Sequence, residues 1–288
     1  MRKLFKIKEF HLMLFPPAFW LLIFFIVPLI IVLVYSVSYK EIYGGVSPGF
    51  TPEHYQAIFN AMYLKIFARS FGYALITTLA TLAIAFPIAY YMSFASARTK
   101  MIIMLMIMIP FWTNFLVRMY ALMTIMGESG LINQLLMSTG IINGPLPLFN
   151  NTFSVFTGFI YWNLPFMVLP IFSSLDRLDT SLLEASLDLG ASKTQTFLRI
   201  TLPYSIPGLI AGIIFVFVPT MGNFIVPEFM GGTDNYMIGN LITSQFVNAR
   251  NWPFGSALSV VMIFLVMIFI SLYLRFYKPT GNQGLQTI

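Results

Sequence analysis

Six long apolar stretches run along the chain, and shorter polar segments separate them. They cover residues of about 14–39, 66–94, 101–126, 152–175, 204–228 and 256–277. A helix needs roughly 20 apolar residues to cross a bilayer, because each residue adds about 1.5 Å along the axis. Every stretch reaches that length, whereas the alternating segments of about ten residues found in membrane β-barrels are absent. The pattern therefore predicts an all-α membrane protein, a six-span helical bundle.

The composition supports a membrane protein and excludes several kinds of site. Of the 288 residues, 58% are hydrophobic and 9% are charged, against about 25% charged residues in a typical soluble domain. The chain has no cysteine, which excludes disulfides and thiolate metal sites. Its histidines, His11 and His54, lack neighbours at metal-ligand spacing, so we expect no metal site. No repeat or low-complexity linker divides the chain, which predicts one transmembrane domain over residues 1–288.

Basic residues gather in alternate loops and so report the membrane topology. The amino terminus, the second loop, the fourth loop and the carboxyl tail hold eleven of the sixteen: Arg2, Lys3, Lys6, Lys8, Arg98, Lys100, Arg177, Lys193, Arg199, Arg275 and Lys278. The other loops hold Lys40, Lys65, Arg69 and Arg250. Because cytoplasmic loops carry the excess of basic residues, we predict that both termini are cytoplasmic. The net charge of +6 thus reflects topology rather than nucleic-acid binding.

Proline residues occur in most spans, and the fifth span is the most strongly interrupted. Pro219, Gly222 and Pro227 all fall within nine residues of it. A proline removes a backbone donor and tends to kink its helix, and transport sites tend to form where spans are broken. Most of the other span prolines are explained by bends that packing requires. We therefore predict a transport site near residues 219–227.

The fourth loop, residues 176–203, is the long polar segment on the predicted cytoplasmic side, and it carries helix signals. Ser181 and Glu184 have the spacing of a capping box, in which each side chain bonds the other residue's backbone N–H. The positions that share one helical face follow: Leu182, Ala185, Ser186 and Leu189. Gly190 is placed to end this helix in the left-handed conformation.

A second short helix is predicted directly after Gly190. Ser192 can cap its start, and we expect Pro203 to stop it before the next span. The sequence has no phosphate-binding GxxxxGK[ST] loop and no Asp/Glu/His relay within its spans of the kind that proton-driven carriers use. The energy for transport must therefore come from a partner, and a rigid protrusion can deliver it mechanically to the spans.

This loop resembles the EAA signature of ABC importer permeases. The matching frame consists of Glu184, Ala185, Gly190, Ile200, Leu202 and Pro203, and Ser186 stands where a second alanine is usual. The resemblance implies a coupling element that docks in a cleft of a cytoplasmic ATPase subunit, with Asp188 and Ala191 as further coupling residues. It also implies that ATP and Mg²⁺ are bound by partner ATPase subunits, with no cofactor in this chain.

Four further stretches resemble spermidine/putrescine permeases, specifically the first of the two permease subunits. They are PFWTNFLVRMYAL (110–122), LPFMVLPIFSSLDRLD (164–179), MGNFIVPEFMGG (221–232) and NWPFGSALS (251–259). The similarity covers most of residues 66–277. It implies the type I ABC importer permease fold and a place in the bacterial cytoplasmic (inner) membrane. The implied partners are a second, homologous permease, two ATPase subunits and an extracytoplasmic polyamine-binding protein.

A polyamine is a flexible polycation, so its path should offer carboxylates and aromatic faces. The candidates are Glu228, Phe224, Trp112, Asn114, Tyr120, Asn223, Trp162 and Asp234. Glu228 is the main candidate because it ends the interrupted fifth span. For each aromatic residue the alternative is an interfacial belt unrelated to substrate.

Arg118 lies in the predicted outer half of the third span, where a cation facing a polycation's path would oppose transport. We predict that it snorkels to the outer interface or pairs with Glu128 or Glu228. A pair with Glu228 would form a gate that incoming substrate could open.

Other functions stay open at this point. The chain could be an ABC permease for another small solute, such as thiamine, ferric ion or an anion, although the fifth span shows no cluster of cations for an anion. A stand-alone channel or secondary carrier disagrees with the coupling loop. An intramembrane enzyme would need a His/Asp/Glu constellation, which the spans lack. Preference between putrescine and spermidine is not fixed by the sequence.

Overall fold

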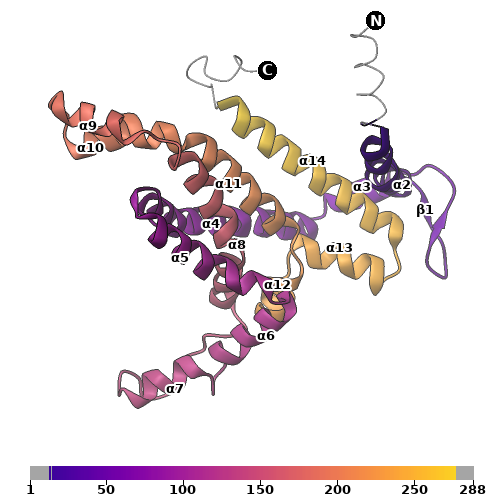
Figure 1. Cartoon of the computed structure of the whole chain (residues 1–288). Helices are drawn as coiled ribbons and strands as arrows, with labels where there is room; N and C mark the ends of the chain where they lie inside the picture. The colour runs from indigo at the N-terminus through magenta and orange to yellow at the C-terminus, as the bar shows by residue number, and fades with distance from the viewer. Residues whose placement is uncertain (1–12, 14, 277–288) are drawn as a thin grey trace, which may run out of the picture. The chain divides into compact units, whose positions relative to one another are not determined.

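The computed structural model describes residue 13 and residues 15–276 (Figure 1). Within these residues, six helical segments are long and apolar enough to cross a membrane. They are Phe15–Ser36, Ala61–Phe94, Phe115–Ser138, Thr152–Leu175, Lys193–Gly222 and Trp252–Arg275. The prediction of an all-α, six-span membrane protein is confirmed. The basic residues of the amino terminus and Lys278 of the carboxyl tail, on which the predicted topology partly rests, lie outside the described residues.

Several spans are assembled from more than one helical element. The α-helices are α2 (Val27–Ser36), α3 (Glu53–Ile58), α4 (Ala61–Phe94), α5 (Ala97–Met108), α6 (Phe115–Met126), α7 (Leu131–Ser138), α8 (Thr152–Leu175), α9 (Thr180–Asp188), α10 (Lys193–Thr196), α11 (Leu202–Gly222), α12 (Ile225–Met230), α13 (Ile238–Val247) and α14 (Trp252–Phe276). The π-helical turns are η1 (Leu22–Ile26) and η3 (Phe197–Thr201), and the 3₁₀ turns are η2 (Ile109–Trp112) and η4 (Thr233–Asn235). The strands are β1 (Tyr39–Lys40) and β2 (Val46–Ser47).

The chain forms two compact units, and the first joins the described residues up to Leu64 with those from Leu241 onward. In this unit α2 packs against α14. β1 pairs with β2 in antiparallel register, with Tyr39 opposite Ser47. The hydroxyl of Tyr55 in α3 donates to Ser36 Oγ at the end of α2, at 2.7 Å. These contacts fold the loop after the first span back onto that span. The single-domain organisation of the chain stays a prediction.

The second unit covers residues 65–240, and the antiparallel pair α8–α11 is at its centre. At one end of α8, Ser154 Oγ donates to the carbonyl of Met230, which ends α12, at 2.5 Å. At the other end, Ser174 Oγ donates to the carbonyl of Tyr204 in the first turn of α11, at 2.8 Å. The elements α9 and α10 therefore lie at the opposite end of this pair from α12, as Figure 1 shows.

Two glycines allow α8 and α11 to approach closely. A β-carbon at Gly208 would overlap the carbonyl oxygen of Pro170 and lie 2.8 Å from Ile171 Cα. A β-carbon at Gly212 would lie 2.7 Å from Met167 Sδ. Small residues four positions apart are typical of close helix pairs in membranes. The Gly-x-x-x-Gly spacing that marks this helix contact is visible in the sequence, although it was not among the predicted features.

The helix α8 contributes to two hydrophobic clusters of this unit. One cluster joins α8 to α4 and α11 through Ala85, Ala89, Met92, Met167, Val168, Ile171, Leu175 and Val216. The other joins it to α6 and α12 through Met119, Met126, Val155, Phe159, Val226, Met230 and Met237. Because α8 continues towards α9 at one end and contacts α12 at the other, it connects the predicted coupling loop with the predicted substrate path.

The predicted third span, residues 101–126, is not one continuous helix. It consists of α5, the 3₁₀ turn η2 and α6, with Thr113 in an extended conformation between them. Pro110 lies in the first positions of η2, and a proline cannot donate the backbone hydrogen bond that a continuing α-helix needs. The α-helix therefore changes to a 3₁₀ helix around Pro110, the backbone is extended at Thr113, and a new α-helix begins after its N-cap, Asn114. The prolines outside the fifth span predicted bends alone, so this break was not predicted.

Candidate functional site

The helix α9 starts two residues earlier than its predicted capping box implies. Its N-cap is Asp179, whose carboxylate accepts the backbone N–H of Ser181 at 2.9 Å. That bond, followed by one with the Ser181 hydroxyl, lowers the pKa of the Asp179 carboxyl, so the cap is charged at neutral pH. The predicted capping box between Ser181 and Glu184 is wrong, because Ser181 already lies inside the helix.

Gly190 ends α9 as predicted. Its φ is +85°, in the left-handed region that glycine adopts without a steric cost. Its N–H donates to the carbonyl of Leu187 at 2.9 Å, and the N–H of Ala191 donates to the carbonyl of Ser186 at 3.1 Å. These two bonds form a Schellman motif, which satisfies carbonyls that a helix end leaves free. The turn between the two short helices is thereby fixed by backbone geometry.

The second short helix is also capped as predicted, but it does not stop where predicted. Ser192 and Gln195 form a reciprocal capping box, with bonds of 3.3 and 2.9 Å. The prediction that Pro203 stops the helix is wrong, since α10, η3 and α11 run on without a break. The N–H of Leu202 bonds the carbonyl of Phe197, five residues back, and this π-helical turn accommodates the proline that follows. The two short helices α9 and α10 form a protrusion, and α10 continues into the fifth span as unbroken helix.

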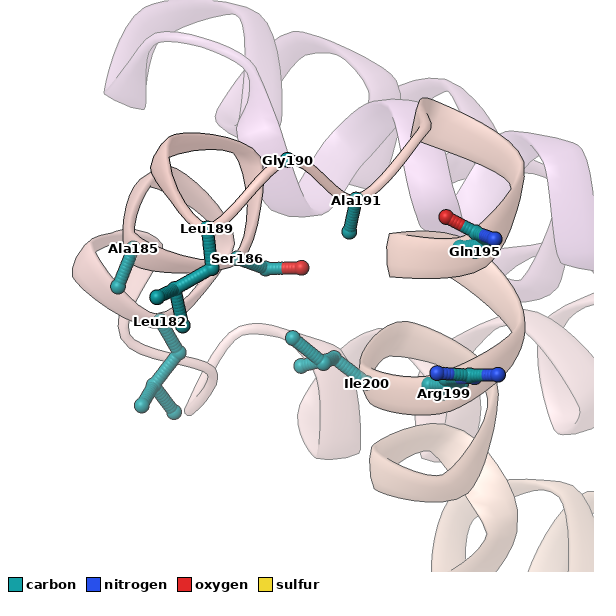
Figure 2. Close-up of a pocket in the computed structure, with 9 residues that line it drawn as sticks. All are labelled: Leu182, Ala185, Ser186, Leu189, Gly190, Ala191, Gln195, Arg199 and Ile200. Atoms are coloured by element: carbon teal, nitrogen blue, oxygen red, sulfur yellow. The ribbon is translucent and has the colours of Figure 1, made fainter.

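The helix α9, the turn at Gly190 and the segment α10–η3 line an open pocket of about 500 Å³ (Figure 2). The hydroxyls of Ser186 in α9 and Thr196 in α10 lie 3.0 Å apart and form a hydrogen bond between the two helices. Five predicted coupling residues line the pocket: Ala185, Ser186, Gly190, Ala191 and Ile200. So do Leu182 and Leu189 of the predicted helical face, and Gln195 and Arg199, which the sequence analysis did not select.

Four predicted coupling residues lie outside the lining of the pocket. Leu202 and Pro203 begin α11, whereas Glu184 and Asp188 are exposed on α9. Because they are four positions apart, Glu184 and Asp188 lie on the same side of the helix. The protrusion therefore presents two exposed carboxylates and an 88% exposed Leu189 on capped helices joined by the hydrogen-bonded turn at Gly190.

The two predicted path asparagines stabilise the ends of broken helices. Asn114 Oδ1 accepts the N–H of Leu116 at 2.8 Å and caps α6. Asn223 Oδ1 accepts the N–H of Val226 at 2.9 Å, at the start of α12. The fifth span thus breaks inside the predicted segment 219–227, since α11 ends at Gly222 and α12 begins at Ile225.

Part of the predicted substrate path comes together where α6 contacts α12. The rings of Tyr120 and Phe229 meet edge to face, with centroids 5.4 Å apart. Glu228 is exposed on α12, and its Oε2 accepts the Asn240 side-chain N–H at 2.8 Å. Asn240 also donates to the carbonyl of Phe224 at 3.0 Å. The structure therefore links Glu228 with the backbone of Phe224 through Asn240, which orients the carboxylate, and it places Tyr120 against the residue after Glu228.

The remaining path candidates have other surroundings. Trp112 is 81% exposed in η2. Asp234 is exposed in η4, and its backbone carbonyl accepts a hydrogen bond from Arg69. Trp162 packs against the rings of Phe111 and Phe115. Nothing in the sequence marked Asn240, because its link to Glu228 arises only from the fold.

Arg118 is buried in an aromatic cluster rather than paired with a carboxylate. Its guanidinium carbon lies 4.3 Å from the ring centroid of Phe111 and 4.9 Å from that of Trp162. The side chain is 7% exposed, and its Nε and Nη1 have no hydrogen-bond partner within the described chain. The pairs predicted with Glu128 and Glu228 are absent from this structure, and so is the predicted snorkelling. The physical reason is that Arg118 and the exposed Tyr120 are two residues apart and face different sides of α6.

This placement predicts the result of a charge swap. Arg118→Glu is expected to lower the stability of the purified protein by about 2 kcal/mol or more, because a carboxylate loses the attraction of a desolvated cation for the ring faces. Arg118→Lys should remain near wild type, because lysine keeps a cation over the rings. Adding Glu228→Arg to Arg118→Glu should not restore the thermal unfolding temperature in detergent. Recovery in the swapped protein would instead establish the gate pair.

The comparisons with known proteins agree with this architecture. Residues 9–278 match the family described as "Binding-protein-dependent transport system inner membrane component". The chain is 39% identical over 200 residues to the spermidine/putrescine transport system permease protein PotB of Haemophilus influenzae, covering 69% of this chain and 70% of the relative. It is 40% identical over 192 residues to PotB of Escherichia coli K12, covering 67% and 70%.

The fold also matches a solved transporter. A bacterial ABC transporter involved in the import of the acidic polysaccharide alginate superimposes with a TM-score of 0.76, over 96% of this chain and 98% of that chain. The sequence identity is 14%, so this likeness concerns the fold alone. Together with the six apolar helices, these matches identify a multi-pass protein of the inner membrane. The chain belongs to the family of inner-membrane components of binding-protein-dependent transport systems, the permeases of ABC transporters.

Proposed function

We propose that this chain is the permease subunit of an ATP-driven importer that carries polyamines, spermidine and putrescine among them, into the cytoplasm. The observation that carries the proposal is the identity of 39–40%, over about two thirds of the chain, with relatives named as spermidine/putrescine permeases. The EAA-type loop supports the dependence on ATP, because it forms a stiff protrusion joined without a break to the fifth span.

The chemistry of the grouped path residues suits a polyamine. Such a substrate carries several ammonium groups separated by methylenes. A carboxylate can pair with an ammonium group, and aromatic rings can contact both the ammonium groups and the methylenes. Glu228 supplies an exposed carboxylate. Exposed rings are supplied by Phe224, one helical turn before it, and by Tyr120, which contacts Phe229, the residue after Glu228. A single carboxylate binds an ammonium weakly, which suits a protein that must release its cargo.

The proposed assembly follows from the same resemblance. A second, homologous permease would pair with this chain, and an extracytoplasmic polyamine-binding protein would deliver substrate. Two ATPase subunits would bind ATP and Mg²⁺ and receive the protrusion formed by α9 and α10. Both termini would then be cytoplasmic, as the distribution of basic residues predicts. The chain itself would hydrolyse nothing; it would convert motion of the ATPases into motion of its spans.

The direct test is transport by the complete complex in proteoliposomes. We expect uptake of labelled spermidine or putrescine that requires ATP, Mg²⁺ and the binding protein. Uptake of thiamine or ferric ion, measured in the same vesicles, should stay at background. ATP-dependent uptake of one of those solutes without polyamine uptake would show that the chain carries that solute and not polyamines. Polyamine uptake that persists without the ATPase subunits would contradict the ABC mechanism.

Glu228→Gln is expected to lower polyamine flux roughly tenfold, because a hydrogen bond to a charged group contributes about 1.5 kcal/mol or more. The glutamine keeps an oxygen that Asn240 can bond, so the local fold should be retained. Glu128→Gln is the matched control, since Glu128 is also exposed but lies two residues after the last residue of α6. Binding of the loaded receptor should be unchanged in both. Unaltered flux in Glu228→Gln would remove this carboxylate from the path.

A further inference from the structure

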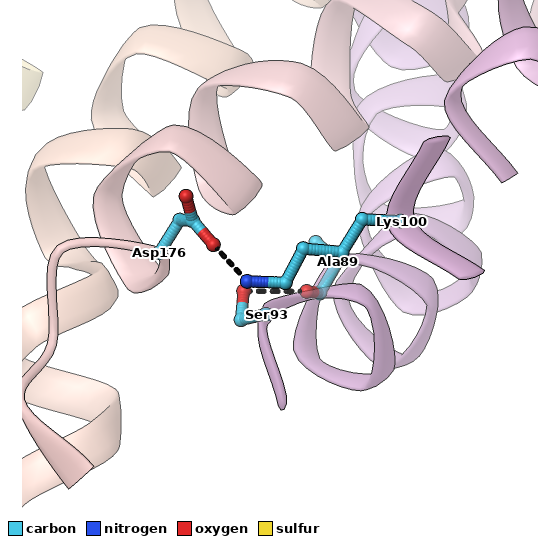
Figure 3. A network of polar contacts seen from close by, with 4 residues as sticks. All are labelled: Ala89, Ser93, Lys100 and Asp176. Atoms are coloured by element: carbon cyan, nitrogen blue, oxygen red, sulfur yellow. Dashed lines mark hydrogen bonds and ion pairs between the residues drawn. The ribbon is translucent and has the colours of Figure 1, made fainter. Parts of the chain in front are cut away.

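An ion pair outside the EAA-type frame joins two spans next to the protrusion. Lys100 Nζ lies 2.5 Å from Asp176 Oδ1 (Figure 3). Lys100 is in the first turn of α5, and Asp176 is the residue that ends α8. Lys100 Nζ also lies 5.9 Å from the ring centroid of Phe172, one turn before Asp176. The lysine is therefore held against the end of α8 by both a charge and a ring.

The connection from Asp176 to the protrusion is short and ordered. Only Arg177 and Leu178 separate Asp176 from Asp179, which caps α9. Leu178 is buried, with 6% of its surface exposed, and its N–H bonds the carbonyl of Leu175 at 3.0 Å. Because this connection is short and ordered, a displacement of α9 should also displace Asp176.

The connection from Lys100 leads to the predicted substrate path. Lys100 lies on α5, a continuous helix that ends at the break around Pro110 and Thr113. The next helix, α6, carries Tyr120, which contacts Phe229 beside Glu228. The ion pair thus closes a contact between residues 76 positions apart and links the corner of the protrusion to the interrupted third span.

We propose that Lys100 and Asp176 form a positioning contact that transmits displacement of α9 to α5, and through it to the interrupted third span. This inference rests on the proposed function, because it requires an ATPase that moves α9. The two side chains are 29% and 40% exposed, and partly exposed pairs contribute little to folding stability. The pair is therefore suited to join two moving elements, and its loss should alter coupling more than folding.

A neighbouring arginine, Arg98, provides a matched control. Arg98 lies two positions before Lys100, is exposed, and has no ion pair among the residues that the structure describes. Charge reversal at Arg98 changes the net charge of the same cytoplasmic loop as reversal at Lys100 does. Any effect on membrane topology should therefore appear in both variants, whereas loss of the contact with Asp176 occurs in one.

The experiment compares Lys100→Glu, Asp176→Lys, the double reversal, Lys100→Arg and Arg98→Glu in the complete complex. The readout is solute imported per ATP hydrolysed, measured with whichever solute the wild-type complex carries. We expect each single reversal to lower this ratio about tenfold, within the 5–150-fold range of typical coupling between sites. The double reversal should recover to about half of wild type or better, as should Lys100→Arg, and Arg98→Glu should match wild type.

Insertion is checked by labelling a cysteine introduced into the carboxyl tail, since the chain has no native cysteine. Single reversals that keep the wild-type ratio would overturn the proposal. So would a double reversal that inserts and assembles normally yet imports no more per ATP than the singles. A wild-type complex that carries a solute other than polyamine would contradict the proposed substrate but leave this ratio measurable. The two failures are therefore distinguishable.

Discussion

Replacing Gly190 with valine is expected to lower ATP-driven import 5–30-fold while leaving the protein inserted in the membrane. The φ of +85° at Gly190 costs a residue with a β-carbon about 1–2 kcal/mol, which corresponds to a factor of roughly 5–30 in a conformational equilibrium. A β-branched residue is especially poor there. Valine retains the N–H that donates to Leu187, so the substitution changes the preferred backbone conformation and the side-chain volume but not the hydrogen-bond donor.

Gly190→Asn is the matched control, because asparagine tolerates the left-handed region. No atom lies within 4 Å of a β-carbon built at Gly190, so the larger side chain has room. We expect the asparagine variant to keep most of the import rate, measured with ATP hydrolysis in the same vesicles. If valine and asparagine lower import equally, side-chain volume rather than the turn conformation would be decisive, and the rigid-turn account would be wrong.

Gly208→Ala is expected to prevent α8 and α11 from packing as they do. The added β-carbon would overlap the carbonyl oxygen of Pro170 and lie 2.8 Å from Ile171 Cα, and backbone atoms cannot rotate away as a side chain can. Overpacking of this kind typically costs about 1–3 kcal/mol, and more where the backbone must shift. We predict a lower thermal unfolding temperature and a lower yield of monodisperse protein in detergent.

The control for this substitution is Gly72→Ala in α4. A β-carbon at Gly72 meets no atom within 4 Å, and alanine is favoured over glycine in a helix by about 0.5–1 kcal/mol. Gly72→Ala should therefore be neutral or slightly stabilising. A Gly208→Ala protein as stable as Gly72→Ala would show that α8 and α11 are further apart than described.

The features that the sequence predicted correctly are those that depend on neighbouring residues. The left-handed turn at Gly190 and the cap at Ser192 each need only a few adjacent positions. The wrong start of α9 has a local origin too: Asp179 and Ser181 both suit an N-cap, and the carboxylate of Asp179 is the one that caps the helix. The continuation through Pro203 depends on a π-helical turn, which has no clear signal in sequence.

The candidate site was predicted less completely because its contacts are tertiary. Glu228 and Asn240 are brought together by a turn of the chain after the fifth span, and no periodic pattern connects them. The surroundings of Arg118 come from η2, α6 and α8, so a rule based on charge alone suggested a carboxylate partner. By contrast, the close contact at Gly208 and Gly212 was readable from their four-residue spacing.

The central claim is that the protrusion formed by α9 and α10 contacts an ATPase, and a single-cysteine crosslink tests it most directly. Leu189→Cys places a thiol at an 88% exposed position on this protrusion, in a chain without native cysteine. Ile141→Cys, at a 70% exposed position after α7 on the predicted outer side, is the control. In the assembled complex we predict a crosslink from residue 189 to the ATPase subunit and none from residue 141. An assembled, transporting complex in which residue 189 forms no crosslink to the ATPase would contradict the account.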